Sequence, residues 1–156
     1  PEEHLVLLTT GGIRGSYDML DRLRERSEVR FLLSGSSGTL RREANLIHLP
    51  HRSGHHHPDL VRASDAVVGK AGYGTVAEVR ASGIPFARVL RDNFRESPVL
   101  GAYLDKHIPG FTLSDSQFNC GSWIDRLDEL LSQPRNDNGN DNGASLAAAH
   151  IVPFLQ

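Results

Sequence analysis

Short, uninterrupted apolar runs alternate with amphipathic stretches along the chain. Runs of this kind are typical of buried parallel strands, and stretches with apolar residues three or four positions apart are typical of helices that cover a sheet. The runs predict strands at residues 5–8, 29–33, 45–49, 66–68, 84–90 and 110–113. The amphipathic stretches predict helices around Leu20 and at residues 58–64, 73–82, 97–107, 122–132 and 144–155.

Glycine-rich turns separate these elements, and two segments are expected to be irregular. Residues 34–38 (Ser-Gly-Ser-Ser-Gly) follow the second strand, and residues 134–143 contain two Asn-Gly steps that favour turns. Strands that alternate with helices predict an α/β fold, with a Rossmann-like open parallel sheet and helices on both of its faces.

The composition fits a single soluble globular domain. The chain has 156 residues, of which 38% are hydrophobic and 23% charged, as in ordinary folded proteins. Its formal net charge of −2 argues against nucleic-acid binding, and its single cysteine, Cys120, predicts a reducing, cytoplasmic setting. No apolar run reaches the roughly 20 residues of a transmembrane helix. Because the chain starts at Pro1 and enters a strand at once, we expect a fragment of a longer protein.

One segment, DAVVGKAGYGTVAE, combines a strand end, a glycine-rich turn and a helix start. Ligands of open parallel sheets bind beyond the carboxyl ends of the strands, where this segment turns. Gly69, Gly72 and Gly74 let the backbone turn tightly, and the first N–H groups of the helix favour a diphosphate without a metal. Thr75 adds a hydroxyl, and Glu78 lies on the same helix face, where its carboxylate suits two ribose hydroxyls. Glycines at such a turn also serve packing alone, so their spacing leaves both interpretations open.

The longer stretch at residues 65–85, DAVVGKAGYGTVAEVRASGIP, resembles the donor-site signature of the C-terminal domain in family 28-type glycosyltransferases. This family includes the peptidoglycan N-acetylglucosaminyltransferase and the plant galactolipid synthases. Residues 10–15 (TGGIRG) resemble the glycine-rich loop after the first strand of that domain, and the Asn-Gly step before the Ala-rich helix resembles its closing element. The resemblance implies that residues 1–156 form the nucleotide-sugar-binding, C-terminal half of a two-domain GT-B fold.

The resemblance also implies roles for individual residues. Gly72, Tyr73, Gly74 and Thr75 would hold the donor diphosphate, and Glu78 would bind the ribose hydroxyls. Three loops would complete the site: a cleft loop with Gly11, Gly12, Arg14 and Gly15, a nucleobase loop with His57 and Pro58, and a donor-sugar loop with Asn93, Arg95 and Glu96. The donor-sugar loop departs from the glutamine-rich form of the peptidoglycan enzyme, which leaves the sugar open.

The implied activity is transfer of a hexose-type sugar from a UDP-sugar to an unknown acceptor, without a metal or other cofactor. A missing N-terminal domain or a separate subunit would supply the acceptor pocket and the general base, so no catalytic residue is assigned and the chain alone is expected to be inactive. Two alternatives remain open. One is a nucleotide-sugar epimerase or hydrolase of the same architecture, and the other is a non-catalytic domain that senses a nucleotide or binds a partner protein.

Four histidines lie near the middle of the chain, at His51, His55, His56 and His57. Consecutive histidines in a loop point in different directions, and no cysteine or aspartate at metal-ligand spacing accompanies them. We therefore expect nucleobase contact or a solvated loop here, and no metal site.

Overall fold

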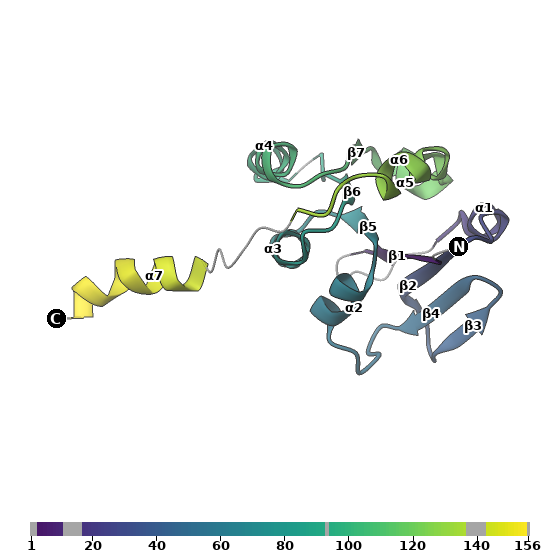
Figure 1. Ribbon diagram of the computed structural model, residues 1–156, viewed down its shortest axis with the longest axis horizontal. Coiled ribbons are helices and arrows are strands. Elements are labelled where there is room, and N and C mark those ends of the chain that lie inside the picture. The colour runs from purple at the N-terminus through teal and green to yellow at the C-terminus, as the bar shows by residue number, and fades with distance from the viewer. Residues whose placement is uncertain (1–2, 11–16, 93, 137–142, 156) are drawn as a thin grey trace.

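A sheet of seven strands forms the centre of the computed structural model, which describes residues 3–10, 17–92, 94–136 and 143–155 (Figure 1). The strands are β1 (His4–Thr9), β2 (Val29–Ser37), β3 (Arg41–Glu43), β4 (Leu46–Pro50), β5 (Ala66–Lys70), β6 (Phe86–Val89) and β7 (Thr112–Leu113). Their order across the sheet is β3-β4-β2-β1-β5-β6-β7. Neighbouring strands pair in parallel, except that β3 runs antiparallel to β4.

Helices cover both faces of the sheet, and each face has its own apolar core. On one face pack α1 (Leu20–Glu25), α5 (Asp115–Cys120), the 3₁₀ helix η1 (Ser122–Arg126) and α6 (Leu127–Leu131). On the other face pack α2 (His57–Ala63), α3 (Tyr73–Ser82) and α4 (Ser97–His107). Val6 and Leu8 of β1 join the first core and Leu7 joins the second, because successive side chains of a strand point to opposite faces. The predicted fold class is confirmed.

Helices α3 and α4 have the predicted bounds. Helix α3 ends at Gly83, whose φ of +66° places it in the left-handed region that favours glycine. A Cβ atom at Gly83 would lie 1.9 Å from the carbonyl oxygen of Asn136, whose N–H in turn donates to the carbonyl of Gly83 at 2.7 Å. The end of α3 is therefore determined both by the left-handed conformation of Gly83 and by the close contact of Gly83 with Asn136.

The loop predicted at residues 34–38 is wrong for most of its length. Strand β2 continues through Ser37, with an irregular register against β4 between Leu33 and Ser37. The antiparallel strand β3 was not predicted, because Arg41–Glu43 is a polar, largely exposed edge segment without an apolar run. The single helix predicted at residues 122–132 is instead divided into η1 and α6.

Gly69 does not lie in a turn, as the sequence predicted, but inside strand β5. A Cβ atom at this position would lie 2.0 Å from the carbonyl oxygen of Thr9 and 2.9 Å from its Cγ2. The residue is therefore glycine because β1 and β5 approach each other closely at their carboxyl ends.

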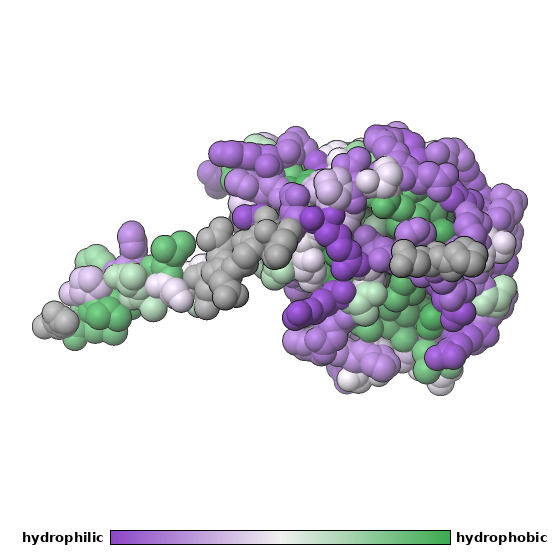
Figure 2. All heavy atoms as spheres, in the orientation of Figure 1, coloured by the Kyte–Doolittle hydropathy of each residue, from purple (hydrophilic) through white to green (hydrophobic). Residues whose placement is uncertain are grey.

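Helix α7 (Gly143–Ile151) and the 3₁₀ helix η2 (Val152–Leu155) stand away from the sheet, at the yellow end of the trace in Figure 1. The helix is present as predicted, but neither element contains a buried residue. Figure 2 shows that much of this segment is apolar. Its exposed large apolar side chains are Leu146, Ile151, Val152, Phe154 and Leu155.

None of the helices in the described part of the chain combines the length and the apolar character that crossing a bilayer requires.

Candidate functional site

A cavity of about 350 Å³ opens at the carboxyl ends of the central strands. Thr9 and Thr10 border it at the end of β1, Ser34 and Gly35 near the end of β2, and Lys70 at the end of β5. Ligands of open α/β sheets bind at this edge, where neighbouring connections leave the sheet on opposite faces. The central strands thus place backbone turns and polar side chains around one space.

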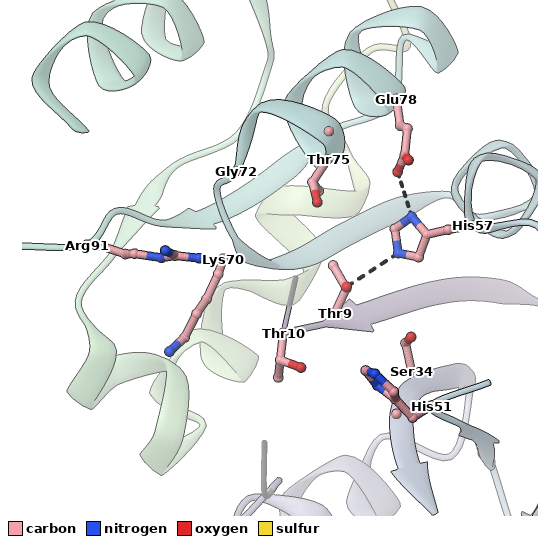
Figure 3. A pocket seen from close by; sticks show the side chains of 12 residues that line it. Thr9, Thr10, Ser34, His51, His57, Lys70, Gly72, Thr75, Glu78 and Arg91 are labelled. Carbon is pink, nitrogen blue, oxygen red and sulfur yellow. Dashed lines mark hydrogen bonds and ion pairs between the residues drawn. The ribbon is translucent and has the colours of Figure 1, made fainter. Parts of the chain in front are cut away.

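The amino end of helix α3 forms one wall of this cavity, through Gly72, Gly74 and Thr75 (Figure 3). Gly72 caps the helix in an extended conformation and provides no side-chain hydrogen bond, while its carbonyl accepts the first helical bond from the N–H of Val76 at 2.9 Å. The N–H groups of the first turn are not used by the helix itself, and they carry the positive end of its dipole. This wall is therefore suited to a phosphate group.

Three polar side chains form a continuous chain along a second wall. The Nδ1 atom of His57 lies 2.5 Å from Oε2 of Glu78, and its Nε2 atom lies 3.3 Å from Oγ1 of Thr9 (Figure 3). His57 is the first residue of α2, Glu78 lies in the middle of α3, and Thr9 ends β1. The chain thus connects two helices to the central strand at the cavity.

Two cations border the cavity on the side of β6, and neither was predicted as a site residue. Lys70 lies 3.6 Å from Asp115, and the guanidinium carbon of Arg91 lies 5.4 Å from the centroid of the Phe94 ring. Both cations follow closely on the ends of neighbouring parallel strands, β5 and β6. The sequence carried a signal for this placement, because Lys70 and Arg91 each come shortly after a predicted strand, at residues 66–68 and 84–90.

A buried tyrosine supports the floor of the site. The hydroxyl of Tyr17 lies within hydrogen-bond distance of the carbonyl oxygens of Leu8 (3.1 Å) and Ser34 (2.9 Å), and so links the ends of β1 and β2. Burial raises the pKa of Tyr17 well above its usual range, which keeps this hydroxyl neutral.

The structure brings together some of the predicted site residues and separates others. Gly72, Gly74, Thr75, Glu78 and His57 all border the cavity. The predicted residues that are described but lie outside its lining are Tyr73, Pro58, Arg95 and Glu96. Gly11, Gly12, Arg14, Gly15 and Asn93 lie outside the described residues. The ligand contacts assigned to all these residues remain predictions.

Tyr73 does not line the cavity, and 58% of its surface is exposed. Partial desolvation and the nearby carboxylate of Glu96 raise the pKa of Tyr73, in that order of importance. Among the predicted diphosphate-binding residues it is the one whose side chain is not at the cavity, so any contact it makes there would use its backbone N–H.

Among the described residues, no group of three or more His, Cys, Asp and Glu side chains is arranged to hold a metal ion. Of the central histidines, His51 and His57 border the cavity, whereas His56 is exposed and lies 3.6 Å from Asp59.

Sequence comparisons do not establish the family of this chain. No protein-family model matches the chain. An L-arabinokinase from Arabidopsis thaliana is 36% identical to it over 149 residues, which are 96% of this chain and only 14% of that protein.

Solved glycosyltransferases share the fold at low sequence identity. The calicheamicin glycosyltransferase CalG4 matches 99% of this chain with 43% of its own, at a TM-score of 0.64 and 16% identity. The spinosyn forosaminyltransferase SpnP matches 99% of the chain with 43% of its own, at a TM-score of 0.60 and 18% identity. The chain has the fold of one half of a GT-B glycosyltransferase. The family 28-type assignment is not among these matches and remains a prediction.

Proposed function

We propose that this chain is the donor-binding domain of a glycosyltransferase and that its cavity binds a nucleoside diphosphate sugar, with UDP as the nucleotide. The observation that carries the proposal is that the uncapped amino end of α3 and the carboxylate of Glu78 border the same cavity. A nucleoside diphosphate needs an anion site and a hydroxyl acceptor next to each other, and α3 offers both within two turns.

The diphosphate is placed at Gly72, Gly74 and Thr75, where N–H groups and the helix dipole stabilise negative charge. Lys70 and Arg91 border the same cavity and add two positive charges. Transfer of a sugar leaves a nucleoside diphosphate behind with additional negative charge, so donors fixed at this position stabilise the leaving group as the bond to the sugar breaks. No metal is needed for this charge balance.

The ribose is placed at Glu78, and the donor sugar beyond the phosphates on the side of Lys70 and Arg91. In a GT-B arrangement a second domain closes over this edge and brings the acceptor to the anomeric carbon. The present chain spans 43% of the matched chains of CalG4 and SpnP. We therefore propose that the acceptor pocket and the general base lie on another domain or subunit, and that transfer of a hexose-type sugar requires it.

Binding measurements test the proposal. Isothermal titration of the chain with UDP, UDP-sugars, GDP and ADP should give binding of the uridine nucleotides, and Glu78→Ala should abolish most of it. Glu25→Ala is a matched control, because Glu25 is an exposed glutamate on α1, on the opposite face of the sheet. If no nucleotide or nucleotide sugar binds, the donor-site assignment is wrong.

The similarity to an L-arabinokinase favours a second candidate function. In this alternative the domain binds a nucleotide sugar without transferring it and regulates a sugar-phosphorylating enzyme to which it is joined. The two functions differ in the full-length polypeptide that carries the domain. ATP-dependent phosphorylation of L-arabinose that changes on addition of a UDP-sugar supports the regulatory function, whereas sugar transfer to an acceptor supports the transferase.

A further inference from the structure

His57 lies between the central strand and helix α3 and contacts both at the cavity. Its Nδ1 atom is 2.5 Å from Oε2 of Glu78, and its Nε2 atom is 3.3 Å from Oγ1 of Thr9. We propose that His57 is a positioning residue for ribose recognition: it fixes the carboxylate of Glu78 so that the site selects ribonucleotides over deoxyribonucleotides. This inference rests on the proposed nucleotide-binding function.

The chemistry of the contacts determines where the proton lies. An ionised carboxylate only accepts hydrogen bonds, so the Nδ1 atom of His57 carries a hydrogen and donates it to Glu78. In the neutral ring Nε2 is then an acceptor, and the hydroxyl of Thr9 donates to it. Thr9 is only 2% exposed at the end of β1, so the imidazole is anchored to a buried residue of the central strand.

Holding the Glu78 side chain in one position costs conformational entropy, and this cost is met when the domain folds rather than when a ligand binds. A glutamate side chain has three rotatable bonds, and ordering it on binding weakens affinity. The bond from His57 uses Oε2, and among the described residues Oε1 of Glu78 has no hydrogen-bond partner. The Glu78 side chain is 22% exposed and borders the cavity, so a ligand hydroxyl can reach it.

A vicinal diol offers two donors to one carboxylate, and a deoxyribose offers one donor fewer. A partly buried carboxylate that has already lost some of its water discriminates strongly against a ligand that lacks a matching hydroxyl. The preference depends on a fixed carboxylate, because a mobile one can turn to water when the hydroxyl is missing. Removing His57 should therefore lower the preference for the ribonucleotide more than the affinity for the deoxyribonucleotide.

Titration of the full chain with UDP and 2′-deoxy-UDP tests this inference. The wild-type chain should prefer UDP by roughly 10-fold, the usual effect of one hydrogen bond to a charged group. His57→Ala should reduce the preference to less than about 3-fold. His57→Asn should restore most of it, because its amide nitrogen lies near the former Nδ1 position and still donates to Glu78, whereas His57→Gln places its amide nearer the former Nε2 position and should not.

His56→Ala is the matched control, since His56 is the neighbouring histidine and its side chain is 74% exposed. It should bind both nucleotides as the wild type does. Thermal unfolding of each variant shows whether it is folded, and the Asn and Gln variants keep the test valid if His57→Ala unfolds.

The outcomes are distinguishable. An equal loss of affinity for UDP and 2′-deoxy-UDP in folded His57→Ala, or a failure of His57→Asn to exceed His57→Gln in preference for UDP, gives His57 a merely structural role and overturns the inference. Absence of binding of either nucleotide to the wild-type chain overturns the proposed function, and this inference falls with it.

Discussion

On one side of the cavity Glu78 is held by His57 at 2.5 Å, and His57 in turn by Thr9. On the other side Lys70 lies 3.6 Å from Asp115, and Arg91 rests near the ring of Phe94 without a close carboxylate partner among the described residues. The side chains on the first side are held in defined positions by hydrogen bonds, which suits recognition of hydroxyl groups. The second supplies charge on long side chains, which suits a phosphate or sugar whose position changes during a reaction. The two sides should therefore respond differently to mutation and to salt.

The largest effect is expected from Gly69→Ala, which disturbs both sides at once. The new Cβ atom would lie 2.0 Å from the carbonyl oxygen of Thr9, so β1 and β5 must separate at the edge that carries Thr9 and Lys70. Forcing an atom into a packed position of this kind costs about 3 kcal/mol or more. For a domain of this size we expect the thermal midpoint to fall by roughly 10 °C, as measured by circular dichroism.

Gly74→Ala is the control for this substitution. No atom lies within 4 Å of a Cβ at Gly74, and alanine is favoured over glycine in a helix by about 0.5–1 kcal/mol. The variant should melt at or above the wild-type temperature but bind UDP less well, because Gly74 borders the cavity. A Gly69→Ala protein that melts like the wild type would contradict the close approach of β1 and β5.

The next effect in size concerns the fixed side alone. Glu78→Ala removes an acceptor for ribose hydroxyls, and loss of hydrogen bonds to a charged group should weaken UDP binding about 10- to 100-fold. Because the interaction is short and directional, the loss should be similar at low and high ionic strength. Calorimetry at two salt concentrations measures the loss of UDP affinity. A loss that disappears in high salt would mean that Glu78 acts through its charge alone and not through a hydrogen bond to the ribose.

A smaller effect is expected from the cationic side. Lys70→Ala and Arg91→Ala should each weaken UDP binding about 3- to 10-fold at low salt, and the difference from the wild type should shrink in high salt, where such partly exposed charges are screened. Arg62→Ala, an exposed arginine at the end of α2, should change nothing. A salt-independent loss would show that Lys70 and Arg91 make fixed contacts like those of Glu78.

The smallest effect is expected from Tyr73→Phe. The side chain is 58% exposed and lies outside the cavity lining, so UDP affinity should change by less than about twofold, and stability by no more than roughly 0.5 kcal/mol. A larger loss of affinity would mean that the phenol contacts the ligand after all and that this wall of the cavity rearranges on binding.

The sequence predicted most of the fold because buried parallel strands and their covering helices carry strong apolar patterns. The prediction from sequence failed where the apolar pattern does not indicate the conformation of the backbone. Residues Ser34 to Ser37 are polar but continue β2, since strand pairing satisfies their backbone groups. Gly69 was assigned to a turn because glycine signals both a turn and a close approach, and only the position of Thr9 distinguishes them.

The candidate site was predictable where its residues lie close together in the sequence. Gly72, Gly74, Thr75 and Glu78 belong to one strand–turn–helix segment, and the structure places all of them on the cavity. The contact between His57 and Glu78 was not predictable, because it joins two helices through a side-chain geometry that spacing along the chain does not encode. The sequence placed His57 in the nucleobase loop and gave no sign that it contacts Glu78.

Strand β1 is made before the other strands of this sheet, yet it lies in the middle of the sheet. One of its neighbours, β5, comes about sixty residues later, and the link between them includes a bond from the N–H of Leu5 to Asp65 across 60 positions. At the usual elongation rates, the ribosome needs about 3 to 12 seconds to make that intervening stretch. During this time the apolar β1 has one open edge, a condition that favours slow folding and mispairing with other chains. Thr9, which ends β1, is thus made before the other described residues that line the cavity, and the cavity around it is complete only after β5, α3 and Arg91 have been made.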